Sequence, residues 1–133
     1  MNKKVEVSFS EGEGVDKVEF SGVVTLKKLN WSEMNSLQEE ASEVKFLNGV
    51  PTVKVLTSKM KELSILKSCV DSNLHKTTYV EDKVKGGLTP VVVEYKLDNV
   101  LKIRDLPQEV GEELFNEFQL LNTLNSKKNE ISS

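Results

Sequence analysis

The sequence contains very few of the side chains that carry out chemistry. Its 133 residues include one cysteine, Cys69, and one histidine, His75. A single cysteine excludes an intramolecular disulfide, and the usual zinc sites need more Cys and His ligands than this chain has. A catalytic Ser-His-Asp or Cys-His arrangement could form only through His75, which we expect in a solvent-facing polar loop. The sequence therefore predicts no enzyme activity, no metal site and no cofactor.

Long apolar runs and clusters of one charge are also missing. No segment approaches the roughly 20 apolar residues that cross a bilayer, and polar residues from Glu6 onward interrupt any signal-peptide core. The 18 basic and 21 acidic residues are mixed, with a net charge of −3, which offers little to nucleic-acid phosphates or to an anionic membrane. A lone thiol suits a reducing compartment. We expect a cytoplasmic protein (host cytoplasm if viral) that binds neither nucleic acid nor membrane.

Two short segments match ion or phosphate sites only in part. Glu11, Glu13 and Asp16 surround two glycines, but their spacing differs from that of a calcium-binding loop. The segment 83–87, Lys-Val-Lys-Gly-Gly, lacks the P-loop pattern, and no clear helix follows it. We expect the first segment to be a mobile acidic turn and the second to be part of a loop.

The chain begins with two apolar–polar alternations that are typical of strands. Val5, Val7 and Phe9 form the first alternation, and the second runs from Val18 to Leu26. A segment with two glycines separates them. The sequence therefore predicts an N-terminal antiparallel hairpin.

The period of the pattern changes after Asn30. Asn30 followed by Glu33 is the signature of a capping box, and apolar residues at helical spacing predict a first amphipathic helix over 31–44. Asn48-Gly49 is a strong turn signal between two short apolar segments. A second helix is predicted to start at Thr57 or Ser58. Its apolar side consists of Met60, Leu63, Leu66 and Val70, with Ile65 and Cys69 at the margins.

The last third of the chain predicts a loop, a strand and a third helix. Residues 72–89 are polar and contain Gly86-Gly87, which predicts a long flexible loop. Residues 91–95 read as a strand buried on both faces, with Pro90 at its first position or on an edge. Asp105 or Pro107 is expected to begin the final helix, and the polar tail 126–133 is expected to be disordered. We predict a single α+β domain over 1–125, with a small N-terminal sheet packed against about three amphipathic helices.

The final helix carries more apolar side chains than one buried stripe needs. We expect Leu114, Phe118 and Leu121 in the core, and Phe115, Leu120 and Leu124 available for docking another protein. Trp31 could be a further anchor for a partner, since interface hot spots favour Trp. It could also be a core residue or pack at the helix start, and the core interpretation is favoured over the anchor.

Three segments, taken in order, resemble a phage tail assembly chaperone. The first is Leu26-Lys27-Lys28-Leu29-Asn30-Trp31-Ser32-Glu33, where a strand ends and a helix opens. The second is the central helix with Cys69-Val70. The third runs from Ile103 through Leu106-Pro107 to Leu120-Leu121-Asn122. The resemblance covers residues 24–125 in layout. It implies binding to the tape-measure protein, or to tail-tube subunits, during tail assembly.

Other classes of protein also fit the sequence. A virion protein such as a tail-tube or adaptor subunit would suit the strands and the Asn-Gly turn, and would form homo-oligomers. A small adaptor of cellular origin is a third class. All of these classes act by contact with another polypeptide, which is the common expectation for this chain.

Overall fold

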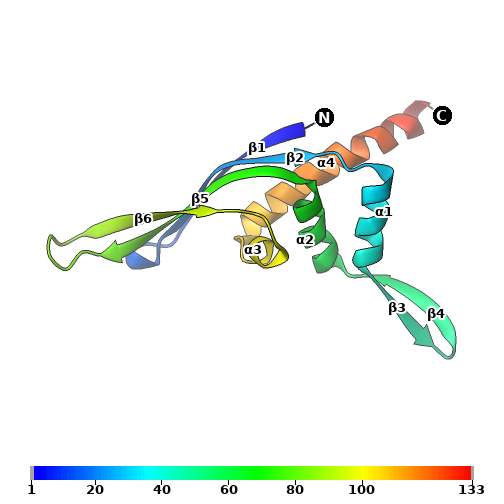
Figure 1. The fold of residues 1–133 in the computed structure, drawn as a ribbon, viewed down its shortest axis with the longest axis horizontal. Coiled ribbons are helices and arrows are strands. Elements are labelled where there is room, and N and C mark those ends of the chain that lie inside the picture. Colours follow the sequence, from blue (N-terminus) through cyan, green and yellow to red (C-terminus); the bar gives the residue numbers. More distant parts are fainter. Residues whose placement is uncertain (1, 133) are drawn as a thin grey trace.

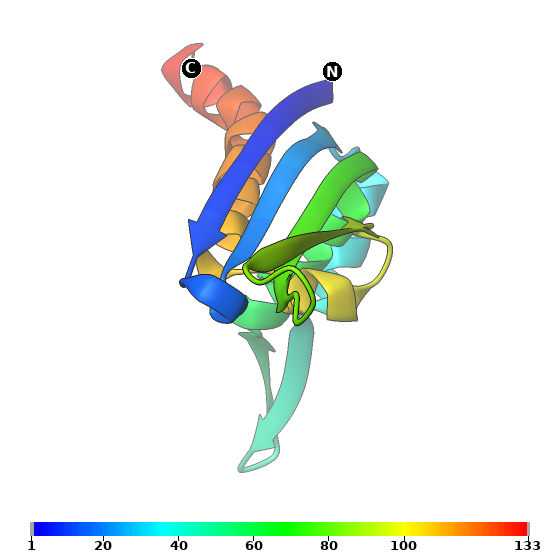
Figure 2. The same cartoon turned by 90° about the vertical axis from the view of Figure 1, so that its left-hand side faces the viewer.

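A computed structural model gives the fold of residues 2–132, and it describes the side chains of residues 2–122. A four-stranded antiparallel sheet of order β1-β2-β5-β6 carries helices on one face, and a separate two-stranded hairpin projects from the body (Figures 1 and 2). The strands are β1 (Asn2–Glu11), β2 (Val18–Lys27), β3 (Ser42–Leu47), β4 (Val50–Val55), β5 (Cys69–Glu81) and β6 (Leu88–Tyr95). The helices are α1 (Trp31–Glu40), α2 (Thr57–Ser68), α3 (Val100–Arg104) and α4 (Gln108–Ser132), with a 3-10 turn, η1 (Gly14–Asp16). The α+β prediction with an N-terminal hairpin is confirmed.

The core lies between the sheet and the helices. Residues opposite one another in register share a face of an antiparallel sheet, so Val5 and Val24 point to the same side, as do Phe9 and Phe20. Val24 is completely buried. The helices contribute Leu37 from α1, Leu63 and Ile65 from α2, Ile103 from α3, and Val110, Leu114 and Phe118 from α4.

Gly22 lets the two central strands approach closely. It has a φ of 142°, and a Cβ built on it would lie 1.9 Å from the carbonyl oxygen of Asn73 on β5. Real Cβ atoms essentially never come within 3.0 Å of another heavy atom in this way. A side chain at this position would therefore force β2 and β5 apart.

The first helix starts as predicted and ends earlier. The capping box at Asn30 and Glu33 is present, but α1 stops at Glu40, so the prediction of a helix over 31–44 is wrong at its C-terminal end. Residues 42–47 pair with β4 instead. The turn Asn48-Gly49 has φ values of 53° and 79°, as a two-residue hairpin turn requires. The strand pairing closed by this turn overrides the helical spacing.

The second helix and the predicted loop also differ from expectation. Neither Thr57 nor Ser58 caps α2, because Leu56 occupies the cap position. The helix ends at Ser68, so Cys69 and Val70 begin β5 rather than extend α2. Most of the predicted loop 72–89 is strand: β5 runs to Glu81 and β6 starts at Leu88. Polar residues suit this strand because one face of the sheet meets solvent.

The edge strand β6 is more exposed than predicted. Val91, Val92 and Val93 are 38%, 59% and 49% exposed, so the strand is not buried on both faces. The reason is its position: it has a neighbour only in β5 and runs past the helices (Figure 1). Pro90 lies on this edge strand, where a missing N–H is tolerated.

The C-terminal third contains one helix that the sequence did not predict. Asn99 caps α3 by accepting a hydrogen bond from the Lys102 N–H at 3.0 Å. The next helix, α4, begins at Gln108, directly after Pro107, and buries Leu114 and Phe118 as expected, with Leu121 half-buried. Disorder was predicted for the tail 126–133. The side chains of these residues lie outside the described part of the structure, so the disorder stays a prediction.

Candidate protein-binding surfaces

Trp31 stands in solvent at the start of α1. Its side chain is 83% exposed, so the core interpretation is wrong. A capping box closes the helix start: the Glu33 N–H donates to Asn30 Oδ1 at 2.8 Å, and the Asn30 N–H donates to Glu33 Oε1 at 3.1 Å. Lys27 Nζ donates to the second carboxylate oxygen of Glu33 at 2.6 Å. This bond from Lys27, followed by the bond from the Asn30 backbone, lowers the pKa of Glu33.

Leu120 on α4 is a second exposed apolar residue that was predicted for docking. It is 47% exposed. Asn122, two residues further along α4, accepts a hydrogen bond from the Leu29 N–H at 3.0 Å and donates through Nδ2 to the Phe118 carbonyl at 2.8 Å. Residues two apart on a helix do not share a face, so Leu120 points away from this contact, and Trp31 and Leu120 are separate exposed side chains.

The other two docking residues predicted on α4 differ from Leu120. Phe115 is half-buried; its ring stacks on Phe118 with centroids 6.1 Å apart, and Lys61 Nζ lies 5.5 Å from its centroid. Phe115 therefore offers less surface to a partner than predicted. Leu124 lies outside the described side chains.

The β3–β4 hairpin has one apolar face that the sequence analysis missed. The register places Val44 opposite Val53, and Phe46 opposite Pro51. The opposite face carries Glu43, Lys45 and Lys54, and at its tip Leu47 lies opposite Val50; these two are 66% and 60% exposed. We define the hairpin face as Val44, Phe46, Pro51, Val53 and Val55; its three valines and Phe46 are 52–71% exposed. The signal was present as period-2 alternation on both sides of Asn48-Gly49, but Val44 had been assigned to a helix.

A second uncovered apolar surface continues the core-facing side of the main sheet. In register, Phe20 on β2 lies opposite Phe9 on β1 and opposite Lys76 on β5. On β6, Val93 lies opposite Lys76, and Val91 lies opposite Thr78. The helices end before this part of the sheet (Figure 1). We define the sheet strip as Phe9, Val18, Val80, Val91 and Val93. Phe9 and Val18 are partly buried against the core, and Val80 is 50% exposed.

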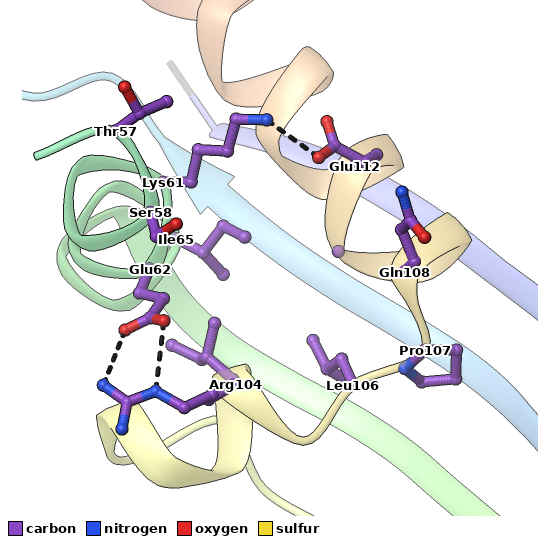
Figure 3. A pocket seen from close by; sticks show the side chains of 12 residues that line it. Thr57, Ser58, Lys61, Glu62, Ile65, Arg104, Leu106, Pro107, Gln108 and Glu112 are labelled. Atoms are coloured by element: carbon purple, nitrogen blue, oxygen red, sulfur yellow. Dashed lines mark hydrogen bonds and ion pairs between the residues drawn. The ribbon is translucent and has the colours of Figure 1, made fainter.

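A hollow of about 240 Å³ lies where α2, α3 and the start of α4 meet (Figure 3). Its charged side chains already form pairs: Arg104 donates twice to Glu62 at 3.1 and 3.0 Å, and Lys61 Nζ donates to Glu112 at 2.8 Å. Buried Ile65 lies between these pairs. All four titratable side chains of its lining, Lys61, Glu62, Arg104 and Glu112, are held in these ion pairs.

His75 and Cys69, the two side chains that could form a nucleophile–base pair, lie far apart on β5. His75 is on β5, opposite Ser21 and Glu94, and not in a loop. It lies six positions along the strand from Cys69, a distance of about 20 Å, which excludes a Cys-His pair. Burial, then the charge of Asp71, raises the pKa of the Cys69 thiol, so it is protonated at neutral pH and a poor nucleophile.

The loop at 82–87 uses its own donors. The Asp82 carboxylate accepts the N–H groups of Val84 at 3.0 Å and Lys85 at 3.1 Å, and these bonds, the one from Lys85 first, lower the pKa of Asp82. These amides are therefore not free to hold a phosphate. Within the described residues, no group of three or more His, Cys, Asp and Glu side chains is placed to hold a metal ion.

Two further findings concern the chain as a whole. Across the described residues, no helix has the length and apolar character required to cross a membrane. The chain matches no protein-family model, no curated protein and no solved structure. Any functional assignment must therefore come from the surfaces described above.

Proposed function

We propose that this chain is a non-enzymatic protein-binding module that acts as a tail assembly chaperone and covers apolar helices of a tape-measure protein. The observation that carries the proposal is the 83% exposure of Trp31 at a helix start closed by a capping box. Trp is among the residues enriched in interface hot spots. The capping box orders the backbone of this helix start before binding, so less ordering of the backbone is needed on association.

Trp31 suits an apolar helix of a partner. A large exposed anchor can contact the apolar stripe of an amphipathic helix. Leu120 on α4 is a second, separate exposed apolar side chain. The resemblance of residues 26–33 and 103–122 to tail assembly chaperones supports the same partner class, and Trp31 lies within the first of these segments.

Co-expression with a candidate tape-measure protein tests the proposal. The wild-type chain is expected to keep that protein soluble and to co-purify with it. Trp31→Ala should weaken binding about 30-fold, equivalent to about 2 kcal/mol for a hot-spot Trp. Because Trp31 contributes little to the core, the free energy of unfolding should change by less than about 0.5 kcal/mol.

Val84→Ser is the matched control. Val84 is 94% exposed in the 82–87 turn, away from Trp31, so its replacement should leave binding unchanged. Leu120→Ser should weaken binding by a smaller factor than Trp31→Ala. Equal binding by wild type and the Trp31→Ala variant would contradict the proposal.

A further inference from the structure

Two uncovered apolar surfaces lie at opposite ends of the molecule. The hairpin face is on the projecting β3–β4 ribbon, and the sheet strip is on the β5–β6 end of the main sheet (Figure 1). The view along the long axis agrees, with the β5–β6 turn in front and the hairpin behind (Figure 2). One molecule cannot cover its own strip with its own hairpin in this fold.

The hairpin has the character of an element that packs against something else. An isolated two-stranded hairpin is marginal in water unless another layer covers it. The backbone hydrogen bond at its base, from the Leu56 N–H to the Ala41 carbonyl at 2.7 Å, ties it to the body. Beyond that base its apolar face remains exposed, with Phe46 at 71%.

The exposed area indicates a weak contact rather than a permanent one. Full burial of a Val, Leu or Phe side chain removes about 100 Å² from water. At the exposures observed, the hairpin face offers on the order of 250 Å² and the sheet strip about 200 Å². With the polar share of an ordinary interface, the total is about 800–900 Å². This is below the standard size and in the range of transient, concentration-dependent association.

Charge also distinguishes the two surfaces. Lys76 lies in the middle of the sheet strip, between Phe20 and Val93 in register. The hairpin face borders a hollow of about 440 Å³ whose lining includes Glu39 together with Val44 and Val53. An acidic group beside one apolar surface and a basic group within the other favour contact between unlike surfaces.

We propose that the hairpin face of one copy docks on the sheet strip of a second copy. The contact is heterologous, so an open assembly has one free hairpin at one end and one free strip at the other, and the copies form either a closed ring or an open filament. Contact between two hairpin faces would leave the sheet strip uncovered in both copies. Head-to-tail contact covers both surfaces.

A mixing experiment on the full-length chain tests this geometry. Phe46→Asp disables the hairpin face and Val91→Asp disables the sheet strip, and each should weaken association at least 30-fold by placing an unpaired charge in the contact. Sedimentation velocity should show wild-type mass rising between about 1 and 500 μM. Each variant alone should remain monomeric. An equimolar mixture should form dimers and stop there, since only one intact hairpin–strip pair can form.

Several results would overturn the proposal. They are a wild-type chain that stays monomeric over this range, a Val91→Asp chain that still associates, or a mixture that does not form dimers. Val84→Asp serves as the control and should assemble like wild type. Circular dichroism checks folding, and Phe46→Ser with Val91→Thr repeats the mixing test with milder changes. Tape-measure binding is measured separately through Trp31, so loss of one activity does not imply loss of the other.

Discussion

Gly22→Ala is expected to be among the most destabilising single changes in this chain. The added Cβ would lie 1.9 Å from the Asn73 carbonyl oxygen and 2.9 Å from the Leu74 Cα. Relief requires β5 to move by about an ångström, which weakens the hydrogen bonds on either side, at about 1 kcal/mol each. It also loosens fully buried Leu74, and the φ of 142° adds about 1–3 kcal/mol of strain for an alanine. The sum is about 3–6 kcal/mol, a large part of the 5–15 kcal/mol typical of a domain.

Gly111→Ala is the matched control for this prediction. Gly111 lies in α4, and a Cβ there would meet nothing within 4 Å. Alanine in a helix should therefore stabilise the chain by about 0.5–1 kcal/mol. Urea unfolding followed by circular dichroism gives both free energies by linear extrapolation. A Gly22→Ala variant within about 1 kcal/mol of wild type would refute the argument from close approach of β2 and β5.

Three further predictions concern the capping box at the start of α1, the loss of stability at low pH, and the reactivity of the Cys69 thiol. Asn30→Ala should lower the free energy of unfolding by about 1 kcal/mol in the same urea assay, because the Glu33 N–H loses its cap; no change would argue against the capping box. The folded-state pKa values of Glu33 and Asp82 lie below their ordinary values, so their contribution to stability is present above the unfolded pKa and is lost as the pH falls through the folded pKa. Urea midpoints should therefore drop as the pH falls below about 5, with a smaller drop in a Glu33→Gln chain; an equal drop in both would exclude a role for Glu33. Cys69 should react with a disulfide reagent much more slowly in the native chain than in urea, because burial raises its pKa; equal rates would show that the thiol is not protected.

Local signals in the sequence predicted the parts of the fold that depend on neighbouring residues alone. The capping box at Asn30 and Glu33 and the turn at Asn48-Gly49 need only residues within one turn of chain. Both are present. The N-terminal hairpin has clear alternation on both strands and was predicted for the same reason.

The errors occurred where distant strands decide the structure. Residues 72–81 look like a loop because they are polar, yet they form a strand since β2 and β6 supply hydrogen-bond partners on both sides. Val44 fits both the helical spacing of α1 and the alternation of a strand, and only its pairing with Val53 decides between the two. Helical spacing and alternation are ambiguous over such short segments.

The candidate surfaces were predictable only in part. Leu120 was predicted to be exposed, and it is. Trp31 lies at a strand–helix junction, where its side chain could point into the core or into solvent. The sequence contains no signal that decides its direction. Alternation on both sides of Asn48-Gly49 indicated the hairpin face, but its exposure and the position of the sheet strip depend on strand register and on where the helical layer ends.

The chain contains one Trp, so its intrinsic fluorescence reports on Trp31 alone, the residue on which the proposed function depends. In the free protein, emission should be typical of a solvated indole and readily quenched by acrylamide. On addition of a tape-measure protein, the emission should shift to the blue and quenching should fall, because the partner covers the side chain. A complex that forms while Trp31 remains fully accessible to acrylamide would contradict the account.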